Sequence, residues 1–154
     1  MTLEEKQRLA LKFLSILGRP DIDVLKEVAV KDMIWTFPGS SAISGEAHGT
    51  EPILARARTI SSHKVKVEIV RTVFGFSGVT VILHNTAAEN GRVLDEHLVA
   101  VFAFRDDKIE RLDTHLSDVE MVTADSSANS KAITPGHREA HCLFEPPRKV
   151  GRMT

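Results

Sequence analysis

Apolar residues in the first part of the chain recur at the period of a helix. From Ala10 onward they follow the spacing i, i+3, i+4 and i+7, which gives one apolar stripe. Thr2 and Glu5 match the capping-box pattern T-x-x-E at a helix start. The pattern therefore predicts a helix over residues 2–17, which ends before Pro20.

Two further helices and a strand are predicted before residue 64. Asp21 is a suitable cap for a short second helix, and Thr50 for a third helix with Pro52 in its first turn. Between them, residues 33–37 (MIWTF) have the composition of a strand and are followed by the turn dipeptide Pro38-Gly39.

The pattern then changes to the period of a β-strand. Residues 65–69 alternate between apolar and polar, and Asn90-Gly91 between two strand-like runs indicates a hairpin. Residues 98–104 are apolar on both faces, residues 106–108 form the next turn, and residues 109–116 form the last strand. Helices first and hairpin-linked strands afterwards indicate an α+β fold with the helices on one face of the sheet.

The last part of the chain, residues 124–154, has no sustained period and contains the breakers TPG and EPP. We therefore expect one domain over residues 1–123 and an irregular or lid-like C-terminal extension over residues 124–154. His137 and His141 are spaced as a metal-binding pair on a helix would be, but incidental histidines in an irregular segment are the better explanation. No metal site is predicted.

Composition narrows the class of protein. The 154 residues are 42% hydrophobic and 27% charged, as in an ordinary globular domain, and the net charge is −1. No broad attraction to nucleic acid or to an anionic membrane is expected. The single cysteine, Cys142, excludes an internal disulfide framework. No apolar run approaches the ~20 residues of a membrane helix, and the acidic N-terminus is unlike a signal peptide, so we expect a cytoplasmic protein.

Several local sequences resemble the nuclear transport factor 2-like superfamily, in its SnoaL-like and ketosteroid-isomerase-like branch. They are Pro38-Gly39 with residues 43–53 (ISGEAHGTEPI), and residues 101–122 (VFAFRDDKIERLDTHLSDVEMV). The similar family pattern is a strand, a glycine-containing loop, a helix, a V-F-x-F strand, a tight turn and a last strand ending in L-S-D. Asp107 replaces the turn glycine. The resemblance covers about residues 3–123.

This resemblance implies a cone-shaped α+β barrel, in which three N-terminal helices close the concave face of a strongly curved antiparallel sheet. It also implies an apolar ligand pocket and no cofactor. Many relatives form homodimers through the convex face, so a homodimer is expected. The fold hosts isomerases, cyclases, epoxide hydrolases, dehydratases and non-catalytic binders, so the fold alone does not indicate the reaction.

Matching the strands to the family divides the strand residues between two faces of the sheet. The inward set is mostly apolar with a few polar groups: Thr36, Val81, Leu83, Asn85, Glu96, Leu98, Ala100, Phe102, Thr114 and Leu116. Phe13 and Phe37 add apolar wall. The outward set is rich in histidine and aspartate: Trp35, His84, Asp95, His97, Asp113 and His115. Substrate contacts are expected from Phe13, Thr36, Asn85, Leu98, Phe102 and Thr114, and from Trp35 if it forms a stacking wall.

Glu96 is the first candidate for catalysis. A carboxylate desolvated by apolar neighbours suits a general acid or base, and Asn85 and Thr114 can orient a carbonyl or hydroxyl beside it. The alternative is that Glu96 is an acid at a strand end in water.

Asp113 and His115 are the second candidate. They lie two apart on one strand and project from one face, so the carboxylate can orient the imidazole as a base. The alternative is that the outward set forms a polar dimer interface. His84, His97 and His115 could also converge on a metal ion, but nothing in their spacing is specific to metal binding.

Two known mechanisms of the family lose support. The positions that match the base and the two donors of ketosteroid isomerase hold Thr36, Phe13 and Ala100. The positions that match the Asp–Arg–Asp set of limonene epoxide hydrolase hold Asn85, Leu83 and Thr114.

Two functions remain. One is cofactor-free acid/base catalysis of isomerase, cyclase or dehydratase type on a small apolar, oxygenated, polyketide- or terpenoid-like substrate. The other is a small-molecule-binding protein without catalysis.

Overall fold

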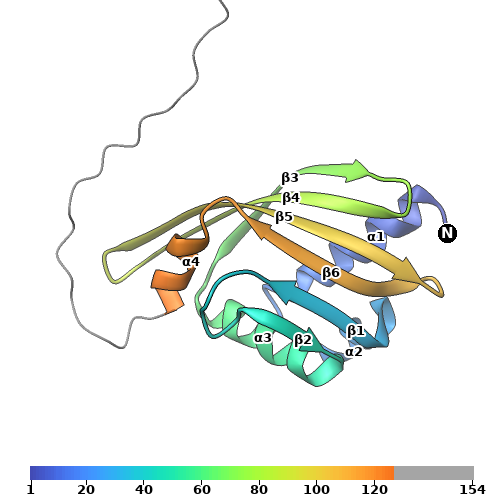
Figure 1. Cartoon of the computed structure of the whole chain (residues 1–154), viewed down its shortest axis with the longest axis horizontal. Helices are drawn as coiled ribbons and strands as arrows, with labels where there is room; N and C mark the ends of the chain where they lie inside the picture. Colours follow the sequence, from blue (N-terminus) through green and yellow to red (C-terminus); the bar gives the residue numbers. More distant parts are fainter. Residues whose placement is uncertain (127–154) are drawn as a thin grey trace, which may run out of the picture.

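The computed structural model describes residues 1–126, which form a six-stranded sheet with four helices. Figure 1 shows α1, α2 and α3 on one side of the sheet, and α4 following the last strand. In chain order the elements are α1 (Leu3–Ser15), α2 (Ile22–Val28), β1 (Ala29–Phe37), β2 (Gly45–His48), α3 (Thr50–Ser62), β3 (Lys66–Phe74), β4 (Gly78–Glu89), β5 (Arg92–Arg105), β6 (Lys108–Leu116) and α4 (Val119–Ser126).

The predicted helix starts are confirmed, with one correction. The capping box is complete: Thr2 Oγ1 accepts the Glu5 amide at 3.1 Å, and a Glu5 carboxylate oxygen accepts the Thr2 amide at 2.6 Å. Asp21 caps α2 through the amides of residues 23 and 24. Thr50 is not a cap but the first residue of α3, because Gly49 takes the N-cap position with φ of 81°. A conformation at positive φ favours glycine over threonine.

Tight turns join the strands from β3 to β6. Asn90-Gly91 forms the predicted hairpin, with φ of 50° and 77°, as a two-residue turn matched to the strand twist requires. Asp106 and Asp107, with φ of 51° and 59°, form the next one. Aspartate tolerates this conformation better than most residues, so the substitution for the family glycine at position 107 preserves the turn.

The sheet is mixed, and the prediction of an antiparallel sheet is wrong for one pair of strands. The strand order is β2-β1-β6-β5-β4-β3, and β1 runs parallel to β6 while every other pair is antiparallel. Hairpin signals report only strands that are consecutive in sequence, whereas four other strands lie between β1 and β6 along the chain. The strong curvature stays a prediction.

The core lies between the helices and the inner face of the sheet. Phe13 of α1 is fully buried and packs edge-on against Trp35 at a ring separation of 5.6 Å and against Phe102 at 5.8 Å. Such edge-to-face contacts add to the stabilisation from apolar burial. They fix the position of the tryptophan ring from the side of α1.

The expected boundary between domain and extension falls inside a helix that the sequence pattern did not predict. α4 spans Val119–Ser126, across residue 123. The irregular or lid-like character of the extension and the His137–His141 pair lie outside the described residues. Within residues 1–126, no helix is both long enough and apolar enough to cross a membrane.

Candidate functional site

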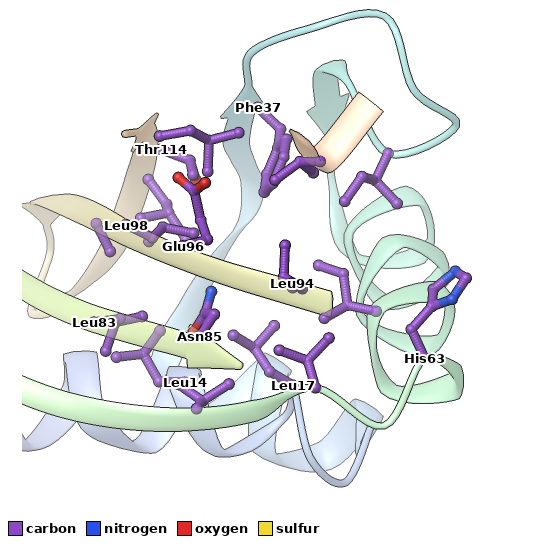
Figure 2. A pocket seen from close by; sticks show the side chains of 18 of the residues that line it. Leu14, Leu17, Phe37, His63, Leu83, Asn85, Leu94, Glu96, Leu98 and Thr114 are labelled. Carbon is purple, nitrogen blue, oxygen red and sulfur yellow. The ribbon is translucent and has the colours of Figure 1, made fainter. Parts of the chain in front are cut away.

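A pocket lies between the inner face of the sheet, α1, α3 and the start of α4, and it encloses about 80 Å³ of free space. Figure 2 shows Glu96 and Asn85 projecting into it from neighbouring strands, with Leu14 and Leu17 on the side of α1. Its wall is mostly aliphatic and aromatic: Leu14, Leu17, Trp35, Phe37, Ile43, Ile60, His63, Val65, Val67, Leu83, Asn85, Leu94, Glu96, Leu98, Ala100, Leu112, Thr114, Leu116 and Val122.

The structure brings part of the predicted site together. Trp35, Asn85, Glu96, Leu98 and Thr114 all line the pocket. The other residues predicted to contact the substrate or to act in catalysis do not line the pocket. Phe13 and Phe102 are buried behind the wall, while Thr36, Asp113 and His115 lie outside the pocket. The sequence pattern did not identify Leu14 of α1, Leu17 just after this helix, or Val122 of α4 as pocket residues.

Trp35 lies on the inner face of the sheet and Thr36 on the outer face, the opposite of what was expected for each. Trp35 is only 2% exposed and lines the pocket. Thr36 lies on the outer face, where its hydroxyl donates to Asp113 Oδ1 at 2.7 Å. The pairing of β1 with β6 shifts register between Ala29 and Ile34. Alternation in β1 is nevertheless regular, with Ala29, Met33, Trp35 and Phe37 all buried, so the expected faces were wrong because the match to the family pattern was displaced by one residue in this strand.

Glu96 is 1% exposed, and its two carboxylate oxygens have different surroundings. Oε1 accepts three hydrogen bonds from the turn before α4: from the Ser117 amide at 2.6 Å, the Ser117 hydroxyl at 3.2 Å and the Asp118 amide at 3.2 Å. Oε2 is buried and has no partner among the described residues. The carboxylate is therefore held firmly through one oxygen while the other remains available.

Asn85 is the cross-strand partner of Glu96 on the same face of the sheet. Side chains paired in this way have Cβ atoms about 4.5–5.5 Å apart. Its Oδ1 is also buried without a partner in the part of the chain that the structure describes. A buried polar atom left unsatisfied costs roughly 1–3 kcal/mol. Two such atoms on paired residues of one pocket indicate a place where a bound water or ligand supplies the missing hydrogen bonds.

Trp35 and Thr114 form a polar contact in the otherwise apolar wall. The indole Nε1 donates to Thr114 Oγ1 at 2.9 Å, and both residues are buried. This bond uses the only hydrogen-bonding group of the indole. Thr114 keeps one hydroxyl hydrogen to donate.

Arg56 is a buried cation behind this wall that the sequence pattern did not identify. It donates to the Trp35 carbonyl at 2.6 Å and to the Gly45 carbonyl at 3.0 Å, and its guanidinium lies 5.1 Å from the Trp35 ring. Burial lowers the pKa of Arg56 below its ordinary value. The available signal was its position on the apolar stripe of α3, between Ile53 and Ile60.

The outer face carries the histidine and aspartate residues, but Asp113 and His115 do not form a hydrogen-bonded pair in the described structure. Both oxygens of Asp113 accept from Arg111 Nε at 2.9 Å. Burial would raise the pKa of Asp113, but the hydrogen bonds from Arg111 and Thr36 outweigh it and hold the pKa below its ordinary value. His115 is exposed.

His84 and His97 stack on the same face. Their ring centroids are 4.6 Å apart, and His84 Nε2 lies 2.6 Å from Asp95 Oδ1. Across residues 1–126, no group of three or more histidine, cysteine, aspartate or glutamate side chains is arranged to hold a metal ion. The described histidines therefore give no support to a metal-dependent reaction on this face.

The fold is shared with known structures, while sequence comparison finds nothing. No protein-family model and no curated protein matches the chain. Bal32a, from a soil-derived mobile gene cassette, is 23% identical over 80% of this chain and 97% of its own, with a TM-score of 0.72. An NTF2-like protein from Burkholderia xenovorans is 20% identical over 82% and 98%, with a TM-score of 0.66. The chain has the NTF2-like fold.

Within this fold, one similar structure is a candidate SnoaL-like polyketide cyclase from Jannaschia sp. It is 14% identical over 82% of this chain and 94% of its own, with a TM-score of 0.62. At such identities the likeness establishes the fold of this chain and leaves its reaction to be argued from the pocket.

Proposed function

We propose that the pocket is the active site of a small-molecule enzyme that uses acid/base chemistry without a cofactor, and that Glu96 moves the proton. The observation that carries this proposal is the asymmetry of the carboxylate. One oxygen is held by three donors, while the other is buried in the pocket without a partner.

This arrangement suits a general base. The three donors fix the plane of the carboxylate, so Oε2 needs no reorganisation to accept a proton from a bound substrate. The resulting carboxylic acid can return the proton at a later step, which leaves the enzyme unchanged. Isomerisation, cyclisation and dehydration of an apolar oxygenated substrate all need such a transfer.

The proposal assigns no catalytic role to Asp113 and His115. They lie outside the pocket, and Asp113 is hydrogen-bonded to Arg111 and Thr36. A base on the outer face would have to act at a second site. The candidate cyclase with the same fold supports small-molecule chemistry of this general kind, and the pocket residues of this chain determine which form of it is possible.

The volume of the pocket limits the substrate. About 80 Å³ of free space accommodates roughly five to eight water-sized groups, at about 10–15 Å³ each. Pockets for drug-sized ligands measure roughly 300–1,000 Å³. We therefore propose a substrate smaller than a polyketide, with an apolar body and one polar end.

A panel of apolar alcohols, ketones and aldehydes with about five to eight non-hydrogen atoms tests the proposal. The full chain is incubated with each in D₂O, and NMR follows both product formation and exchange of carbon-bound hydrogen. For a compound that reacts, Glu96→Gln is expected to lower the rate at least 100-fold, as loss of a general base does.

Glu68→Gln is the matched control, because Glu68 is exposed on β3 and pairs with His84 on the outer face. It should keep the full rate. Undiminished turnover in Glu96→Gln would contradict the role of Glu96. Saturable binding across the panel without any turnover would instead establish a binding protein.

A further inference from the structure

The strand β3 is the outermost strand at one margin of the sheet, as Figure 1 shows, and it pairs with β4 alone among the described strands. Such an edge presents a row of unpaired backbone N–H and C=O groups, here along the nine residues of β3. Three apolar side chains of the strand, those of Ile69, Val70 and Val73, are each between 44% and 53% exposed. The edge therefore offers both backbone and apolar contacts to a further strand.

A β-bulge in the middle of β3 decides which side chains share a face. The pairing with β4 shifts between Ile69 and Arg71, so Val70 is the extra residue. Glu68 and Arg71 are three positions apart in sequence, but their partners on β4 are only two apart. Both side chains therefore belong to the outer face of the sheet.

Two copies of β3 can pair antiparallel about a two-fold axis that passes between positions 69 and 70. Residue 66 of one copy then lies opposite residue 73 of the other, 67 opposite 72, and 68 opposite 71. Each of these pairs joins side chains of the same face, because the bulge of one copy lies opposite the bulge of the other. A displacement by one residue would set outer-face side chains opposite inner-face ones.

Charge complementarity selects the same register. Glu68 of each copy lies opposite Arg71 of the other, which gives two pairs of opposite charge related by the axis. Neither side chain forms an ion pair within residues 1–126, so both charges are available. Charges and bulges commonly keep edge strands apart. In β3 both are symmetric about one point, so they disfavour an unrelated strand and favour a second copy.

We infer that two copies of the chain associate through β3 and join their six-stranded sheets edge to edge. This interface is separate from the proposed active site and from the convex face through which many relatives dimerise, so its test depends on neither. One pair of strands buries less surface than the roughly 1,200 Å² of a stable interface. The association is therefore expected only at high protein concentration.

Light scattering of the full-length chain between about 10 μM and 1 mM tests the inference. The mass of the parent should rise toward twice its value at the lowest concentration. Arg71→Glu and Glu68→Arg each set like charges opposite each other at two points, and each should abolish the rise. The double variant Glu68→Arg/Arg71→Glu restores opposite charges and should restore the rise. Arg58→Glu, on the exposed side of α3, makes the same change in net charge as Arg71→Glu and should behave as the parent.

Hydrogen exchange of the amides in residues 66–74 locates the contact, and circular dichroism checks that each variant keeps its fold. Exchange should be slower at the highest concentration than at the lowest in the parent, the double variant and Arg58→Glu, and unchanged in the two single variants of β3. A constant parent mass, a rise that persists in either of these single variants, or a rise without slower exchange in β3 overturns the inference. So does a folded double variant that fails to associate.

Discussion

At the scale of single residues, Asp113 on the outer face of the sheet makes the stability of the protein depend on pH. Its two oxygens accept from Arg111, and Thr36 donates to Oδ1. Burial opposes the charge, but these hydrogen bonds prevail, and the pKa of Asp113 is lowered from its ordinary value. A carboxylate with a lowered folded-state pKa stabilises the protein above its unfolded pKa of about 4, and this contribution disappears as pH falls through the folded value.

Asp113→Asn should therefore destabilise the protein by about 1 kcal/mol at pH 7, the usual size for a partly exposed charged hydrogen bond. The difference in free energy of unfolding between this variant and the parent should become smaller below about pH 4. Urea unfolding at pH 7 and pH 3 measures both values. Glu89→Gln, at the exposed end of β4, is the control and should have little effect at either pH. A destabilisation that stays constant with pH would exclude this linkage.

The residues of the pocket were predictable where the match to the family pattern agreed with strand alternation. Glu96 and Asn85 were placed correctly because β4 and β5 pair without interruption over that stretch. Trp35 and Thr36 were exchanged because their faces were taken from the match to the family pattern, although the apolar residues Met33, Trp35 and Phe37 alternate regularly and are all buried. Asymmetry between the two oxygens of Glu96 was also beyond prediction, since its donors come from a turn about twenty residues later.

At the scale of elements, Arg56 connects α3 to the two strands at one edge of the sheet. Its guanidinium donates to carbonyls of β1 and β2 and lies over the Trp35 ring. Hydrogen bonds from a charged donor contribute more than neutral ones, and removing one partner leaves the buried carbonyls unsatisfied. The strand β2 has only four residues and lies at the edge of the sheet, where it pairs with β1 alone.

Arg56→Met, which keeps the length and apolar stem, is expected to destabilise the protein by roughly 2–3 kcal/mol. It should also disturb the tryptophan fluorescence, because Trp35 is the only tryptophan in the chain. Arg58→Met on the exposed side of the same helix is the matched control. Equal effects of the two substitutions on urea unfolding would show that the buried contacts of Arg56 are unimportant.

Helices and turns that are encoded by a few adjacent residues were predictable, whereas features that depend on distant parts of the chain were not. The capping box and the Asn90-Gly91 turn are encoded by a few adjacent residues, and both formed as expected. The parallel pairing of β1 and β6 depends on the path of the whole chain and was missed. α4 was missed as well, because it is short and owes its position to contacts with β5, including those from Glu96 to the preceding turn.

At the scale of the whole molecule, the NTF2-like fold leaves one face of the sheet without helices. The inner face is covered by α1, α2 and α3 (Figure 1), whereas the outer face keeps apolar side chains in water. Val73 is 44% exposed, and the half-buried Val99 and Val101 lie near it across β4, whereas the 72% exposed Val93 is separated from them along β5 by Asp95 and His97. Exposed apolar side chains that gather on one face mark an interaction site more often than scattered single residues do.

We expect a second copy of the chain to cover this face, as the resemblance to the superfamily implies, and we expect the dimer to separate when its centre becomes charged. Light scattering coupled to size exclusion should give twice the 17.0 kDa chain mass for the parent. Val101→Arg places a charge at the middle of the face, where Val101 pairs with Thr80 and Asp113, and should give the monomer mass with the fold retained by circular dichroism. Leu3→Arg, an exposed apolar position on α1, should leave the dimer intact. A parent chain that elutes as a monomer at tens of micromolar would contradict the expected dimer.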